Sequence, residues 1–182
     1  KNVDIVIRGE GEETLSELYN LVKKNKSYYK IKGISYKKKG KIIHNQDRPL
    51  IQDINQIPPF PYDLFEKDID KYRDFGTIIT SRGCPFQCIY CSQRCISGGK
   101  YRYLSTERAL YEIDLLVNKY KQKKIWFNED NLAVNKQRLI DLLDGIIKNG
   151  YNKKTQFIGE LRADSIDYEL LKKLKKANFT ML

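Results

Sequence analysis

The fold is decided by the stretch TIITSRGCPFQCIYC, residues 77–91. Its β-branched beginning, Thr77 to Thr80, is typical of a buried strand, and three cysteines follow at Cys84, Cys88 and Cys91. Closely spaced thiolates on one loop are the usual ligands of an iron–sulfur cluster, because one curled segment can reach several irons. Three thiolates leave one iron open to bind a substrate or cofactor. The stretch therefore predicts a strand that leads into a metal-binding loop.

Strands and helices alternate regularly after the cysteine loop. Apolar residues at helical spacing are followed by short β-branched or aromatic runs, and this alternation repeats to the end of the chain. Such repetition favours parallel β-α units. The expected elements are a helix at 106–120, a strand at 124–127, a helix at 136–148 capped by Asn135, a strand at 156–161, a helix at 168–176 and a strand from 179.

Polar residues follow the predicted strands. Crossovers between parallel strands are right-handed, and functional groups collect at the carboxyl ends of the strands. We therefore expect the residues just after Thr80, Phe127 and Leu161 to converge on one rim. The cysteine loop, Asn128-Glu129-Asp130 and Arg162 all fall there.

The first third of the chain has a different organisation. Val3 to Ile7 is predicted to be a strand, and a glycine turn and an amphipathic helix follow it. Residues 31–36 and 41–44 predict a hairpin. Four prolines between Arg48 and Pro61 predict an extended linker and a domain boundary. Because Lys1 is not an initiator methionine and the chain stops in an apolar run, we expect both ends to lie inside a longer protein.

The cysteine motif resembles that of the radical S-adenosylmethionine (SAM) superfamily, whose three cysteines have this spacing and an aromatic residue before the last, here Tyr90. Ser81-Arg82-Gly83 and the Glu129-Asp130 pair are similar to a subgroup that carries a cobalamin-binding domain. So are the turn at 9–14 and the linker at 48–64. The resemblance implies an α/β fold: the first half of a partial (β/α)6 barrel at 76–182, a hairpin and linker at 27–75, and the end of a cobalamin-binding-type α/β domain at 1–26.

The same resemblance implies the cofactors and their contacts. Cys84, Cys88 and Cys91 are expected to hold a [4Fe-4S] cluster, which cleaves SAM reductively to a 5'-deoxyadenosyl radical. By family position, Tyr90 is expected near the adenine and Glu129 or Asp130 at the methionine amine. Arg162 is a further, weaker candidate for the SAM carboxylate, on the general ground that a guanidinium pairs with a carboxylate. Expected partners are a small-molecule or lipid-like substrate and a flavodoxin or ferredoxin. Cobalamin is expected only in the full-length protein, where the reaction would be methyl transfer or a rearrangement.

Simpler interpretations exist for each of these residues. Together with Cys95, the three cysteines could form a zinc site or an electron-transfer cluster with four thiolates. Glu129 and Asp130 could cap a helix. Arg162 could pair only with Glu160 or Asp164, and Phe86 could serve packing alone.

Composition limits the classes of function. The net charge of +11, from 34 Lys and Arg against 23 Asp and Glu, would suit a protein that binds nucleic acid, so an RNA-modifying enzyme is an alternative. This alternative is not favoured, because most of the excess charge is lysine, which is typical of a solvated surface. No apolar run approaches the roughly 20 residues of a membrane helix. All four cysteines lie between 84 and 95, which indicates metal binding in a reducing cytoplasm rather than a disulfide scaffold.

Overall fold

A computed structural model describes residues 3–72 and 75–182. It divides the chain into two compact units, Lys1–Gln52 and Asp53–Leu182. The division lies within the proline-rich stretch in which the sequence predicts a domain boundary. Among the described residues, no helix combines the length and the apolar character needed to cross a bilayer.

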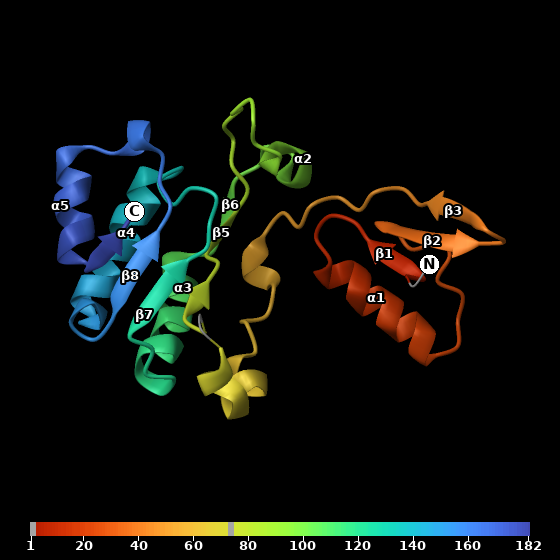
Figure 1. Cartoon of the computed structure of the whole chain (residues 1–182), viewed down its shortest axis with the longest axis horizontal. Coiled ribbons are helices and arrows are strands. Elements are labelled where there is room, and N and C mark those ends of the chain that lie inside the picture. The colour runs from red at the N-terminus through yellow and green to blue at the C-terminus, as the bar shows by residue number, and fades with distance from the viewer. Residues whose placement is uncertain (1–2, 73–74) are drawn as a thin grey trace. The chain divides into compact units, whose positions relative to one another are not determined.

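Unit 1 is a small antiparallel sheet with one helix (Figure 1). The sheet has the order β1-β2-β3, and the predicted hairpin, β2–β3, is confirmed. β2 also pairs antiparallel with β1, so the hairpin belongs to the same sheet as the first strand. Ile31, Ile34 and Tyr36 form the core, against which Leu18 and Leu21 of the helix pack. The elements are β1 (Ile5–Ile7), α1 (Glu12–Lys23), β2 (Ile34–Lys38) and β3 (Lys41–His44).

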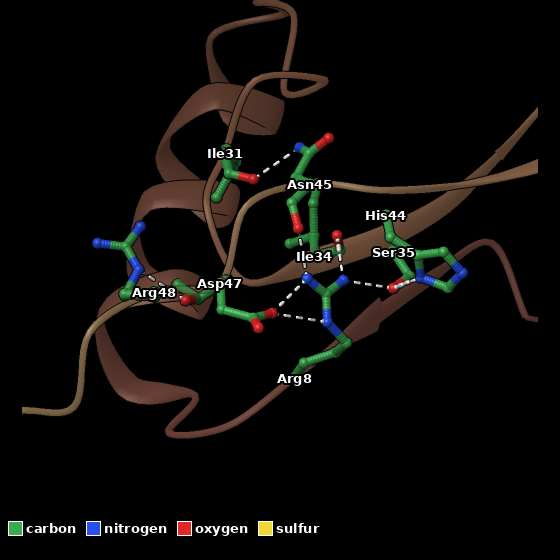
Figure 2. A network of polar contacts seen from close by, with 9 residues as sticks. Arg8, Ile31, Ile34, Ser35, His44, Asn45, Asp47 and Arg48 are labelled. Carbon is green, nitrogen blue, oxygen red and sulfur yellow. Dashed lines mark hydrogen bonds and ion pairs between the residues drawn. The ribbon is translucent and has the colours of Figure 1, made fainter. Parts of the chain in front are cut away.

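The guanidinium of Arg8 joins the ends of all three strands (Figure 2). It donates to the Ile34 carbonyl at 2.7 Å and to the Asn45 carbonyl at 2.5 Å, and it pairs with Asp47 at 2.6 Å. It also donates to Ser35 Oγ, which lies 2.8 Å from His44 Nδ1. The Ile34 carbonyl also accepts from the Asn45 N–H at 3.0 Å, so the arginine adds side-chain hydrogen bonds where the strand ends meet.

Unit 2 contains a parallel sheet in the order β4-β7-β8-β9. The crossover helices follow in the predicted order, which confirms the predicted half-barrel. Strand bounds are β4 (Thr77–Ile78), β7 (Lys124–Phe127), β8 (Gln156–Gly159) and β9 (Phe179–Met181). Helix bounds are α3 (Thr106–Asp114), continued by a π-helical turn at Leu115–Lys119, α4 (Lys136–Lys148) and α5 (Tyr168–Lys176).

Each crossover helix begins at a polar cap. The side chains of Ser105, Asn135 and Asp167 accept hydrogen bonds from the backbone N–H three residues later, at 3.2, 3.0 and 2.9 Å. These bonds satisfy donors that a helix start leaves free. The cap predicted at Asn135 is confirmed.

The helices cover one face of the sheet (Figure 1). Phe127, Phe157 and Phe179 come from three adjacent strands and lie with their ring centroids 5.5–5.9 Å apart. They are buried in one cluster with the apolar faces of the helices. Side chains alternate across a strand, so Trp126 and Ile158 lie on the opposite face and are only partly buried.

The predicted strand at 77–80 is shorter than expected. Only Thr77–Ile78 pairs with β7, and the chain then forms β5 (Ser81–Arg82), which pairs antiparallel with β6 (Arg102–Tyr103). The sequence of residues 77–82 gives no sign that the chain changes its partner strand after Ile78, from β7 to β6. Further short elements are the 3-10 segments Ile54–Gln56, Tyr62–Lys71, Tyr151–Lys153 and Ala163–Ser165, and α2 (Gln93–Ser97).

Replacement of Phe157 by alanine should destabilise unit 2 strongly. Phe157 is fully buried between two other phenylalanines, and Phe→Ala in a core costs about 3–5 kcal/mol of unfolding free energy. Urea denaturation measures this cost. Tyr168→Ala is the control, because Tyr168 is 69% exposed and should change stability by about 0.5 kcal/mol or less. Equal effects of the two variants would contradict this core.

Candidate functional site

The cysteine loop begins at the carboxyl end of β4, and the β5–β6 pair closes its base. Ser81 lies opposite Tyr103 and Arg82 opposite Arg102, so residues 83–101 form one closed excursion from the sheet. α2 lies within this excursion (Figure 1). The loop is thus anchored at both ends to one two-stranded ladder.

Gly83 allows the chain to enter the loop. Its φ is +84°, and an added Cβ would lie 2.2 Å from the Lys100 carbonyl oxygen and 2.9 Å from the Ser97 side chain. Only glycine combines this backbone conformation with so close an approach. The outgoing and returning segments of the loop therefore touch at Gly83.

All four cysteines are free thiols. Cys84 and Cys88 are partly buried, whereas Cys91 and Cys95 are exposed. The Cys91 N–H donates to the Cys88 carbonyl at 3.1 Å, so the backbone turns between these two residues. Within residues 3–72 and 75–182, no three His, Cys, Asp or Glu side chains are arranged to hold a metal ion. The three-cysteine ligand set stays a prediction.

Glu129 lies at the predicted rim but faces inward. Its Oε1 accepts from the Thr80 N–H at 2.7 Å and from the Thr80 hydroxyl, and its Oε2 accepts from the Ser81 hydroxyl. The residue is only 4% exposed. The carboxylate therefore connects the loop after β7 to the root of the cysteine loop.

Arg138 of α4 completes this buried network. It donates to the Thr80 carbonyl at 2.9 Å and to the Thr80 hydroxyl at 2.6 Å. It also lies 3.4 Å from the Tyr101 hydroxyl. Burial raises the pKa of Tyr101, an effect that the nearby Arg138 charge opposes. Sequence reasoning missed Arg138, although a long cation in the first turn of an otherwise amphipathic helix is a signal for such a contact.

Asp130 and Tyr90 are on the accessible side of the site. Asp130 Oδ2 accepts from Gln93 Nε2 of α2 at 2.7 Å, an exposed contact. Tyr90 is 89% exposed. The structure thus separates the predicted acidic pair: Glu129 is buried in a network, and Asp130 is accessible beside the loop.

Arg162 contacts the cysteine loop directly. Its Nη1 lies 3.2 Å from Cys88 Sγ, and its guanidinium carbon lies 4.0 Å from the Phe86 ring centroid. It also pairs with Asp164 through two nitrogens. This pair lowers the pKa of Asp164 and raises that of Arg162. Arg162 therefore pairs with Asp164, but not with the acid alone, because it also contacts Cys88 and Phe86.

The chemistry of the loop fits an iron–sulfur cluster. Free thiols are the ligands that such clusters use, and a cation beside Cys88 suits the negative charge of bound thiolates. No disulfide involves Cys84, Cys88 or Cys91, so all three sulfurs are available.

The fold and the loop together define a class of protein: a parallel α/β half-barrel with a cysteine loop at the carboxyl end of its first strand. The family described as the Radical SAM superfamily matches residues 78–182, which is more than half of the chain. This protein belongs to the radical SAM superfamily, a superfamily of enzymes.

Its relatives carry methyltransferase and cyclase names. It is 36% identical over 178 residues to the Uncharacterized methyltransferase PH0819 of Pyrococcus horikoshii, covering 96% of this chain and 38% of that protein. It is 29% identical over 182 residues to the anaerobic magnesium-protoporphyrin IX monomethyl ester cyclase of Synechocystis sp., covering 96% and 35%. These names indicate an enzyme.

A solved structure shows the same fold. The cobalamin-dependent S-adenosylmethionine radical enzyme OxsB, with aqua-cobalamin bound, superposes with a TM-score of 0.72 at 27% identity and covers 95% of this chain. The match takes in 25% of the OxsB chain. The present chain therefore spans less than two fifths of each of these three relatives.

Gly83→Ala should distort the cysteine loop more than Gly99→Ala. Both glycines have a positive φ, but an added Cβ at Gly99 meets no atom closer than 3.9 Å. The shared backbone strain costs about 1–2 kcal/mol, and the clash at Gly83 adds about 1–3 kcal/mol. Thermal unfolding of both variants measures the difference. Equal melting temperatures would show that Gly83 does not pack against Lys100.

Glu129→Ala should destabilise the chain, whereas Asp130→Ala should not. Removal of the buried carboxylate leaves three donors on Thr80 and Ser81 without an acceptor, at a cost of about 2–4 kcal/mol. Asp130 has an exposed partner, so its replacement should cost about 0.5 kcal/mol or less. Urea denaturation compares the two variants, and a larger loss for Asp130→Ala would contradict the network.

Proposed function

We propose that this chain supplies the cluster- and SAM-binding part of a radical SAM enzyme. One observation carries the proposal. The Cys84, Cys88 and Cys91 loop rises from the carboxyl end of β4 in a fold that matches the superfamily over residues 78–182. In parallel α/β folds, ligands bind at that edge of the sheet.

The three cysteines would hold a [4Fe-4S] cluster. When bound, such a cluster supplies one electron to SAM, which is cleaved to methionine and a 5'-deoxyadenosyl radical that abstracts hydrogen from a substrate. The chain's own part is to present three free thiols on a loop closed by β5 and β6.

Asp130 is a better acceptor than Glu129 for the methionine amine of SAM. Both oxygens of Glu129 already accept hydrogen bonds from Thr80 and Ser81, and the residue is buried. Asp130 has one exposed partner, Gln93, which a ligand can displace. Tyr90, exposed between Cys88 and Cys91, is available to lie against the adenine.

The reaction of the whole protein is proposed from its relatives. Methyltransferase and cyclase names among them favour methyl transfer or a rearrangement on a small-molecule or lipid-like substrate. The electron would come from a flavodoxin or ferredoxin. OxsB is described as cobalamin-dependent, which supports cobalamin in the full-length protein. This chain's one histidine, His44, is hydrogen-bonded to Ser35 within unit 1, and we place the cobalamin site in the part of the full-length protein outside this chain.

Anaerobic reconstitution with iron and sulfide should load about four irons per chain. Iron analysis and electron paramagnetic resonance (EPR) of the reduced protein measure the cluster, and SAM should alter the spectrum because one iron is open. Cys84→Ala, Cys88→Ala and Cys91→Ala should each abolish loading.

Cys95→Ala is the matched control, because Cys95 is an exposed thiol of the same loop. The proposal predicts normal loading and an unchanged response to SAM. Loss of the cluster in Cys95→Ala would instead indicate a site with four thiolates that transfers electrons. Zinc in place of iron would indicate a structural module.

A further inference from the structure

Arg162 is held beside a cysteine by contacts on three sides. Its Nε and Nη2 donate to the two carboxylate oxygens of Asp164, at 3.0 and 2.5 Å. Its guanidinium carbon lies over the Phe86 ring, 4.0 Å from the centroid, and Nη1 donates to Cys88 Sγ at 3.2 Å. The planar fork of a guanidinium keeps its donors in fixed directions. Asp164 and Phe86 therefore aim one N–H at the sulfur.

This arrangement depends on the tertiary structure. Arg162 follows β8, and Cys88 lies 74 residues earlier, on the loop after β5. β4 and β8 flank β7 in the sheet, so their carboxyl ends open onto the same rim. Phe86, from the cysteine loop itself, contributes the ring that supports the guanidinium.

We propose that Arg162 tunes the reduction potential of the cluster through the Cys88 thiolate. The inference rests on the proposed function, since it requires Cys88 to be a cluster ligand. Hydrogen bonds to cluster sulfurs and nearby net charge are established determinants of iron–sulfur potentials. One-electron reduction adds a negative charge, and a fixed cation with its N–H on a ligand sulfur stabilises that charge. Arg162 therefore raises the potential and makes reduction easier.

The charge of Asp164 cancels only part of this effect. Asp164 binds Nε and Nη2, whereas Nη1 points at the sulfur. Its side chain is 61% exposed against 33% for Arg162, so water screens the carboxylate more than the guanidinium. Asp164 also raises the pKa of Arg162, which stays charged at any working pH.

The test is an anaerobic redox titration of the reconstituted 182-residue chain without SAM. Titanium(III) citrate serves as the one-electron reductant, and the EPR signal of the reduced cluster is the readout. Arg162→Gln should lower the midpoint potential by about 59 mV or more, a tenfold change in the ratio of reduced to oxidised cluster. Arg162→Lys keeps the positive charge but loses the planar guanidinium that directs an N–H at Cys88. Its midpoint potential should therefore fall by less than that of Arg162→Gln.

Lys172→Gln is the matched control. Lys172 also pairs with a carboxylate, Glu169, and lies over an aromatic ring, Tyr168, but it has no sulfur contact. Its replacement removes the same charge and should leave the potential unchanged. An Arg162→Gln potential equal to that of Lys172→Gln overturns the proposal. If SAM affinity falls in that variant instead, Arg162 binds the SAM carboxylate.

The other outcomes are also decisive. If Arg162→Gln does not take up iron, the potential of Arg162→Lys is measured instead. A wild-type potential in Arg162→Lys refutes a role for the N–H that Arg162 donates to Cys88. If the wild-type chain binds no four-iron cluster, the proposed function fails, and this inference fails with it. Normal loading together with an unshifted potential in the Arg162 variants refutes only the inference.

Discussion

The position of the cysteine loop depends on one buried carboxylate, that of Glu129. It receives three hydrogen bonds from Thr80 and Ser81, where the chain leaves the parallel sheet for the β5–β6 ladder. Arg138 holds the same threonine from the helix side. A buried charge is costly unless it is fully hydrogen-bonded, so this network defines one arrangement of the strand end, the loop root and α4.

Each unit places one arginine near the strand ends, where it donates to backbone carbonyls. In unit 1, Arg8 donates to the carbonyls of Ile34 and Asn45. In unit 2, Arg138 donates to the Thr80 carbonyl where β4 ends. In both units a guanidinium with several donors thus adds to backbone hydrogen bonds that are already present, from the Asn45 N–H in unit 1 and from the Leu104 N–H in unit 2.

Most of the fold could be predicted from local patterns. The capped helix at 136–148 has the predicted bounds, because its signals are local: a polar cap at Asn135, an apolar stripe along the helix and a glycine at 150 just after its end. The end of β4 at Ile78 could not be predicted, since a β-branched run has the same sequence pattern whichever strand it pairs with. The rim was located correctly, but the inward direction of Glu129 was not anticipated, because its partners lie 48 and 49 residues away.

The sequence by itself determined the α/β class, the order of strands and helices, and the spacing of the three cysteines, because periodicity and motif spacing are local properties. The tertiary structure alone decided which charged groups meet. It buried Glu129, left Asp130 accessible, and placed Arg162 against Cys88 and Phe86. The physical reason is that parallel strands bring their carboxyl ends to one edge, where side chains distant in sequence compete for the same few partners.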